Sequence, residues 1–230
     1  MRLIVLWDID HTLIENGGVS KEIYAAAYST IVGRPPAGPA KTEGRTDRLI
    51  MRGMLQQHGV AEPEWPVVEA ALARAGAGRE EELRHRGAVL PGVYAALTAA
   101  AGRRGWVSSV LTGNIAANAR VKLSAFDLDP LLDLPVGAYG ADAEQRPDLV
   151  AVARERAQLL RGAREDVPVV LIGDTPRDVQ AALVTGSEII AVASGINSAD
   201  ELATAGASMV LPDLADTERV ITLLEGFARH

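Results

Sequence analysis

Residues 3–13 read LIVLWDIDHTL. An unbroken apolar run, Leu3–Trp7, precedes two aspartates, Asp8 and Asp10, and such runs are typical of strands buried on both faces of a parallel sheet. Side chains at i and i+2 of an extended chain point to the same side, so we expect both carboxylates to lie together where this strand ends. Open α/β sheets bind their ligands at that carboxyl end.

The rest of the chain alternates between short apolar runs and segments with helical periodicity. The runs predict further strands at Trp106–Leu111, Val167–Ile172, Glu188–Val192 and Ser208–Leu211. The periodic segments predict helices at Val93–Ala101, Ile115–Phe126, Pro147–Leu160, Asp178–Val184, Ala199–Ala205 and Thr217–Phe227. This alternation predicts an α/β fold with a doubly wound, parallel (Rossmann-like) sheet.

One stretch, residues 15–88, lacks a strand pattern. Its periodicity predicts helices at Val19–Val32, Thr46–His58, Glu64–Ala75 and Glu80–His85. Ser20 is a possible N-cap of the first of these helices. We therefore predict a helical domain of residues 15–88, inserted into an α/β core domain of residues 1–14 and 89–230.

Composition narrows the range of functions. The 230 residues include no cysteine, which excludes disulfides and thiolate metal sites and fits a cytoplasmic location. The net charge is −7 and no basic stripe is present, so we expect no nucleic-acid partner. No apolar run approaches the roughly 20 residues of a membrane span. We expect the N-terminal run to be a buried strand and not a signal peptide, because it reaches Asp8 without a cleavage site.

A second group of acids follows the predicted strand Val167–Ile172, where residues 173–178 read GDTPRD. Asp174 stands at the strand tip, and Asp178 falls in the first turn of the next helix, where the helix dipole alone also favours an acid. If the two strands are neighbours, these acids meet Asp8 and Asp10. Carboxylates 4 Å apart repel by about 4 kcal/mol per pair at a dielectric of 20, so the cluster must bind protons or a cation. All-oxygen ligands suit Mg²⁺.

Two other strand ends carry groups that a phosphate needs. Thr112, Gly113 and Asn114 lie between a strand and a helix, where backbone N–H groups favour an anion. Thr112 could equally be a helix N-cap. Arg146 precedes Pro147, which is expected to open a helix, although an arginine here could also be an ordinary surface residue.

Together, these four segments resemble, in order, the four motifs of the haloacid dehalogenase superfamily. The matching residues are Asp8-x-Asp10-x-Thr12, Thr112-Gly113-Asn114, Arg146-Pro147 and Gly173-Asp174-x-x-x-Asp178. The helical insertion resembles the cap domain of the phosphoglycolate phosphatase and β-phosphoglucomutase branch. The resemblance implies a magnesium-dependent phosphatase that hydrolyses a small phosphorylated metabolite.

The resemblance also implies roles for these residues. Asp8 would attack phosphorus and form an aspartyl-phosphate, while Asp10 would protonate the leaving alkoxide and then activate water. Magnesium would be held by Asp8, the main-chain carbonyl of Asp10 and Asp174, with Asp178 as a ligand or support. The phosphoryl oxygens would be bound by the second and third motifs, that is, by Thr112, Gly113, Asn114 and Arg146.

The third motif departs from the family pattern, because many members have a lysine where this chain has Arg146. Lys122 is a rival for that role, although its place within a predicted helix favours a structural or surface role. In the inserted domain, Arg45 stands in a Gly-Arg-Thr-Asp segment that faces the active site in related caps. It is either a substrate contact or a surface residue, and Asp47 could cap the following helix.

Rival functions remain open at this point. A dehalogenase needs no acid at the position of Asp10, and a phosphonate-cleaving enzyme needs a cap lysine, for which Lys21 and Lys41 lie in no recognisable motif. A sugar-phosphate mutase of the β-phosphoglucomutase type shares all four motifs. A non-catalytic binding protein on the same fold is the remaining alternative. The oligomeric state and the particular substrate are not readable from the sequence.

Overall fold

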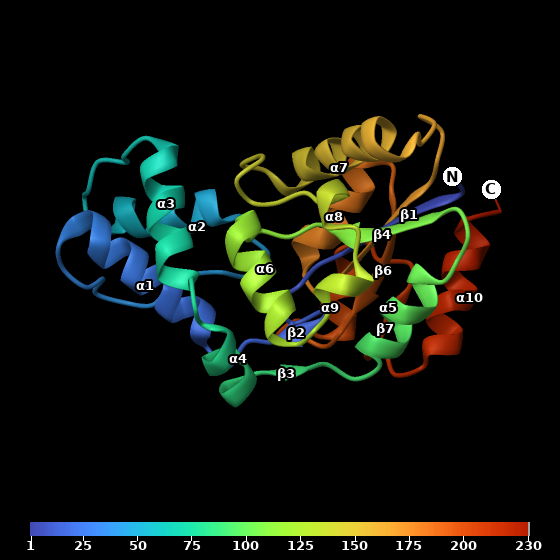
Figure 1. Ribbon diagram of the computed structural model, residues 1–230, viewed down its shortest axis with the longest axis horizontal. Coiled ribbons are helices and arrows are strands. Elements are labelled where there is room, and N and C mark those ends of the chain that lie inside the picture. The colour runs from blue at the N-terminus through green and yellow to red at the C-terminus, as the bar shows by residue number, and fades with distance from the viewer. Residues whose placement is uncertain (230) are drawn as a thin grey trace.

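The computed structural model describes residues 1–229. Within this range the main sheet has five parallel strands in the order β4-β1-β5-β6-β7. Their bounds are β1 Leu3–Trp7, β4 Trp106–Val110, β5 Val169–Gly173, β6 Glu188–Val192 and β7 Val210–Leu211. The predicted doubly wound α/β fold is confirmed (Figure 1). Strand β1 is an inner strand, paired with β4 on one side and with β5 on the other.

Alternate residues of β1 belong to two separate cores. Leu3, Val5 and Trp7 pack on one face of the sheet, whereas Ile4 and Leu6 pack on the other. The first face is covered mainly by α5 (Val93–Ala101) and α10 (Thr217–Phe227), with α6 (Ala116–Ala125) beside them. The second face is covered by α7 (Arg146–Arg161), α8 (Pro176–Thr185) and α9 (Ala199–Thr204). Burial on both faces explains why β1 is apolar at every position.

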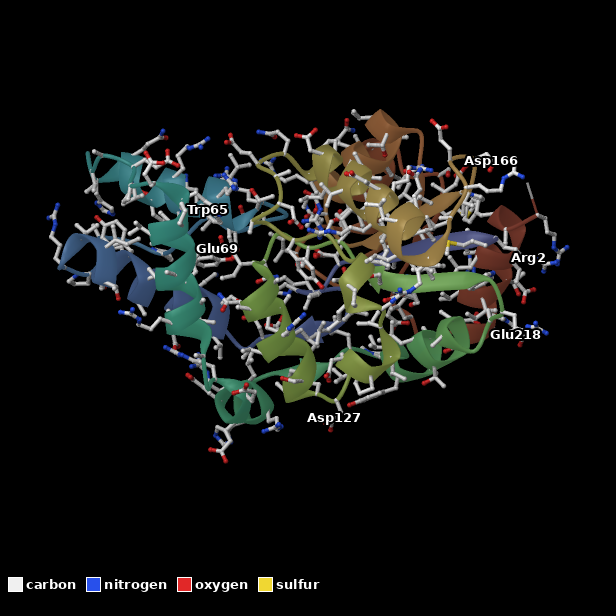
Figure 2. The ribbon with its side chains drawn as sticks, turned by 45° about the horizontal axis from the view of Figure 1, so that its top comes forward. Arg2, Trp65, Glu69, Asp127, Asp166 and Glu218 are labelled. Atoms are coloured by element: carbon white, nitrogen blue, oxygen red, sulfur yellow. The ribbon has the colours of Figure 1, made fainter. Side chains whose placement is uncertain are left out.

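The inserted segment is helical, as predicted. It contains α1 (Val19–Val32), α2 (Asp47–Gln57), α3 (Trp65–Gly76) and α4 (Glu80–Arg86). These helices form their own apolar cluster, to which Ile115, the N-cap of α6, and Ala125, the last residue of α6, also contribute. In Figure 2, Trp65 and Glu69 mark this segment, at the opposite end of the molecule from Arg2 and Glu218.

Two short strands that the sequence did not predict connect the two parts. β2 (Ile14–Glu15) and β3 (Ala88–Val89) pair in antiparallel fashion, so the chain leaves and re-enters the core side by side. Two short 3-10 turns, Asp129–Leu131 and Leu134–Val136, complete the core. No helix among residues 1–229 has both the length and the apolar character needed to cross a membrane.

Candidate active site

The parallel pairing of β1 with β5 brings the two predicted acid groups together. Asp8 follows the last residue of β1, and its backbone N–H donates to the carbonyl of Ile172 at 2.8 Å. Asp174 follows β5 and is 1% exposed. One carboxylate oxygen from each of Asp8, Asp174 and Asp178 lies within 4.8 Å of the others. The Asp10 carboxylate is not in that group, because it turns toward α6.

The acid group fits a hard cation. Asp174 Oδ1 accepts from the Thr12 hydroxyl at 3.2 Å, while its Oδ2 is buried and has no hydrogen-bond partner within residues 1–229. Gly195 leaves the space around that oxygen open, since a Cβ there would stand 1.9 Å from it. Burial, together with the charge of Asp8, raises the pKa of Asp174 well above its usual value. A divalent cation beside these oxygens would offset the repulsion between them.

Asp178 differs from the other two acids because both of its oxygens already have partners. Oδ2 accepts from the backbone and hydroxyl of Thr175, closing a capping box at the start of α8. Oδ1 lies 2.6 Å from Arg146 Nη2. Asp178 therefore serves as a helix cap and holds Arg146 in place.

Arg146 links the acids of the two neighbouring strands. It is the first residue of α7 and is 5% exposed, so it is not a surface arginine. Its Nη2 lies 2.9 Å from Asp8 Oδ2 as well as close to Asp178. Burial raises the pKa of Asp8 to about 6, and the Arg146 charge offsets part of this rise. The guanidinium is thus the cation that accompanies Asp8.

Arg146→Lys should lower kcat/KM roughly 10- to 100-fold, because a lysine keeps the charge but lacks the further donors of the planar guanidinium, including the buried Nε that has no partner among residues 1–229. Arg164→Lys is the matched control, since its pair with Asp166 is solvent-exposed. Measuring kcat/KM for both variants tests the assignment. Equal values for Arg146→Lys and the wild type would show that a point charge is sufficient.

The second predicted motif forms a buried turn. Thr112 is 0% exposed and its hydroxyl accepts from both the backbone and the Nδ2 of Asn114. Helix α6 begins at Ala116, so Thr112 is not its N-cap. Gly113 lies against the inserted segment, because a Cβ there would stand 2.1 Å from the carbonyl oxygen of Arg45. The turn therefore has no room for a side chain at this position.

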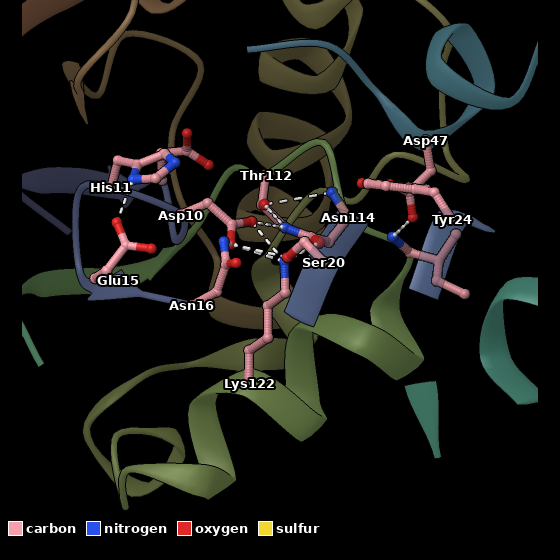
Figure 3. Close-up of polar contacts among 12 residues, drawn as sticks. Asp10, His11, Glu15, Asn16, Ser20, Tyr24, Asp47, Thr112, Asn114 and Lys122 are labelled. Carbon is pink, nitrogen blue, oxygen red and sulfur yellow. Dashed lines mark hydrogen bonds and ion pairs between the residues drawn. The ribbon is translucent and has the colours of Figure 1, made fainter. Parts of the chain in front are cut away.

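Lys122 lies close to Asp10 rather than Asp8. It is 1% exposed and its Nζ lies 2.6 Å from Asp10 Oδ2 (Figure 3), so of the two roles expected for it, structural or surface, the surface role is excluded. Burial would raise the pKa of Asp10, but Lys122 and Asn114 lower it to about 2. Asn16 Nδ2 also donates to Asp10 at 2.8 Å. The site thus separates two cation–acid pairs, Arg146 with Asp8 and Lys122 with Asp10.

The Gly-Arg-Thr-Asp segment of the insertion contacts the core directly. Thr46, not Asp47, is the N-cap of α2, because its hydroxyl accepts from Leu49 N. Asp47 is instead buried and bridges the two parts of the chain, accepting from the Tyr24 hydroxyl at 2.6 Å and from Ile115 N at 2.8 Å. The predicted capping role of Asp47 is therefore wrong, and its carboxylate joins α1 to the start of α6.

Asp47 should make stability depend on pH. Burial raises its pKa to about 6 from 3.8, so the folded protein holds this proton more tightly than the unfolded chain does. Relative to Asp47→Asn, the wild type should lose up to about 3 kcal/mol of unfolding free energy as pH rises from 4 to 6, and no more above that. Urea unfolding of both proteins at several pH values measures this. A constant difference between them would contradict the prediction.

A pocket lies between the carboxyl ends of the strands and the inserted segment. Its lining includes Asp8, Asp10, Thr112, Gly113, Asn114, Arg146 and Asp174 from the core, and Lys21, Tyr24, Gly44 and Arg45 from the insertion. All the predicted site residues except Asp178 thus line one pocket, Arg45 among them. Sequence reasoning missed Asn16 and Tyr24, since a polar residue in a loop and a tyrosine in a helix carry no motif.

The site combines a buried aspartate at the end of β1, a second aspartate two residues on, and an acid pair after the neighbouring strand β5. This arrangement is typical of a class of hydrolases that use an aspartate at a strand end of a parallel α/β sheet. The family model described as haloacid dehalogenase-like hydrolase matches residues 5–183. The chain belongs to this family.

Individual relatives agree with this assignment. Phosphoglycolate phosphatase 1 of Pseudomonas aeruginosa is 27% identical over 93% of this chain and 77% of its own length. Among solved structures, one described as a predicted phosphoglycolate phosphatase from Haemophilus somnus is 19% identical, covers 96% and 98% of the two chains, and has a TM-score of 0.65. One assigned as a β-phosphoglucomutase from Bacteroides vulgatus is also 19% identical, covers 99% and 90%, and has a TM-score of 0.66. At this identity the structures support the fold alone.

Proposed function

We propose that this hydrolase is a magnesium-dependent phosphatase that removes the phosphoryl group of a small phosphorylated metabolite through an aspartyl-phosphate on Asp8. The main observation in support is that two buried polar atoms, on two residues that line the same pocket, lack hydrogen-bond partners. Arg146 Nε is a donor and Asp174 Oδ2 an acceptor, and neither has a hydrogen-bond partner among the described residues. A phosphoryl oxygen would satisfy the donor and a cation the acceptor.

The proposed reaction has two steps. An Asp8 carboxylate oxygen attacks phosphorus, the bond to the leaving oxygen breaks, and Asp10 supplies the proton to that oxygen. In the second step water attacks phosphorus, the bond between Asp8 and phosphorus breaks, and Asp10 accepts the water proton. Arg146, Thr112 and the backbone N–H groups beside Gly113 would bind the phosphoryl oxygens in both steps.

Magnesium is proposed to be held by Asp8 and Asp174, with the main-chain carbonyl of Asp10 as a further ligand and Asp178 as support. When bound, it would withdraw negative charge from the phosphoryl oxygens. The proposal also treats residues 15–88 as a cap domain over a core of residues 1–14 and 89–230. The separate apolar cluster of the helices and the β2–β3 pair support this division.

The substrate is proposed to be small. The pocket is roofed by the insertion and has a volume of about 180 Å³, and its cap side supplies Lys21 and Arg45 as cations for an anionic substrate. The curated relative named above is a phosphoglycolate phosphatase, which supports a short phosphorylated acid as the first compound to test.

A panel of phosphorylated metabolites with Mg²⁺ tests the function. We expect release of free phosphate from phosphoglycolate or another short phosphate ester. Formation of an isomerised sugar phosphate without free phosphate would instead indicate a mutase, in which a sugar hydroxyl replaces water as the acceptor. Absence of turnover on the panel and on an aryl phosphate would contradict both and favour a non-catalytic binding protein.

A further inference from the structure

Lys122 is a buried lysine in a chain that has only two other lysines. Lys21 and Lys41 are exposed, whereas the Lys122 side chain lies between α6 and the end of β1. Its Nζ donates to Asp10 Oδ1 at 2.8 Å, to Asp10 Oδ2 at 2.6 Å and to Asn114 Oδ1 at 2.6 Å (Figure 3). Each of the three ammonium hydrogens therefore has an acceptor.

The position of Lys122 shows that it acts through other residues. It does not belong to the lining of the active-site pocket, as far as residues 1–229 describe it, so it does not touch a substrate there. It also plays no part in balancing the charge of Asp8, which Arg146 accompanies. Burying an ammonium costs several kcal/mol unless it is paired, and a methionine would fill the same space without that cost. Compared with a methionine of similar size, the lysine at position 122 therefore provides the hydrogen bonds to Asp10 and Asn114.

Lys122 orients Asn114 as well as Asp10. The Asn114 Oδ1 accepts from Lys122, so its Nδ2 faces the other way and donates to Asp10 Oδ2 at 2.8 Å. If this amide turned over, its oxygen would face the Asp10 carboxylate and repel it. Lys122 thus holds Asp10 twice, by direct contact with both carboxylate oxygens and by fixing the orientation of Asn114.

We propose that Lys122 is a positioning residue that holds the Asp10 carboxylate, directly and through Asn114, in the orientation required for proton transfer. This inference rests on the proposed phosphatase function. Without Lys122, Asp10 would meet the water that attacks the Asp8-bound phosphoryl group less often. Cleavage of the bond between Asp8 and phosphorus, with transfer of the water proton to Asp10, would then become slow.

The test is Lys122→Met, with Lys41→Met as the control because Lys41 is exposed and lies outside the pocket. The substrate is p-nitrophenyl phosphate, whose leaving group needs no proton. We expect kcat to fall by roughly 100-fold, since a positioned acid–base group is worth at least that much, and KM to fall with it, so that kcat/KM changes little because only the second step is slowed. A pre-steady-state burst of nitrophenol should remain, because phosphoryl transfer to Asp8 is spared. An unchanged kcat, or loss of the burst together with kcat, would overturn the proposal.

A double variant tests the same point if Lys122→Met fails to fold. Asp10→Asn combined with Lys122→Met removes both charges, so no unpaired ion stays buried. If Lys122 acts only through Asp10, the double variant should turn over at the rate of Asp10→Asn alone. A further fall in rate would show that Lys122 acts elsewhere. Absence of Asp8-dependent phosphate release in the wild type would instead refute the proposed function itself.

Discussion

Asp8→Asn is expected to retain less than about 1% of wild-type phosphate release, because an amide cannot form the aspartyl-phosphate and such nucleophiles are worth at least 100-fold. Asp8 is the acid best placed for attack, since it lies at the end of β1 beside Arg146. The measurement is steady-state release of inorganic phosphate at saturating substrate.

The fold of Asp8→Asn should be intact. Arg146 keeps its contact with Asp178, and the buried amide avoids the desolvation cost that raises the pKa of Asp8. Thermal unfolding should therefore occur at or above the wild-type temperature. Asp200→Asn, an exposed aspartate in α9, is the matched control and should turn over normally. Substantial activity in a folded Asp8→Asn protein would remove Asp8 from the nucleophile role.

Removal of divalent cations should reduce turnover to background, and added Mg²⁺ should restore it. Asp8 and Asp174 are buried side by side, and among residues 1–229 the Oδ2 of Asp174 is one of two buried side-chain oxygens without a hydrogen-bond donor. Loss of the cation would leave their mutual repulsion uncompensated, and the transferring phosphoryl group would lose its charge partner.

Cation binding should also be visible without turnover. Because a ligand that binds only the folded state stabilises it, Mg²⁺ should raise the unfolding temperature of the wild type. Asp174→Asn should abolish this rise, whereas Asp200→Asn should keep it. Full activity of protein that has been dialysed against a chelator would contradict the magnesium requirement.

The strands of the core were predictable because each lies in a short, mainly apolar run, although β4 includes Ser108 and Ser109. β1 spans Leu3–Trp7 as expected, and the acids after β1 and β5 meet because those strands are neighbours. The β2–β3 pair was missed, since two-residue strands such as Ile14–Glu15 have no measurable periodicity. The contacts that could be predicted from the sequence are those between residues at the ends of neighbouring parallel strands.

Contacts that depend on how a helix is rotated were not predictable. Lys122 meets Asp10, 112 positions away in the chain, only because α6 turns that face toward the end of β1. The residues next to Asp47 in the sequence favour a helix-capping role for it. Only the packing of α2 against the core shows that its carboxylate bridges Tyr24 and Ile115. The sequence around Lys122 and Asp47 contains no motif from which their contact residues could be predicted.

Because Glu15 pairs with Ala88 in antiparallel fashion, the helical segment between them could be replaced as a unit. Entry and exit lie next to each other, so a different insertion can be grafted there without rerouting the chain. A replacement segment would have to fit residues outside it, because Ile115 and Ala125 of the core contribute to the apolar cluster of the inserted helices. A chimaera that exchanges the helices alone would expose an unmatched apolar face on α6, so that face would have to be redesigned together with the new insertion.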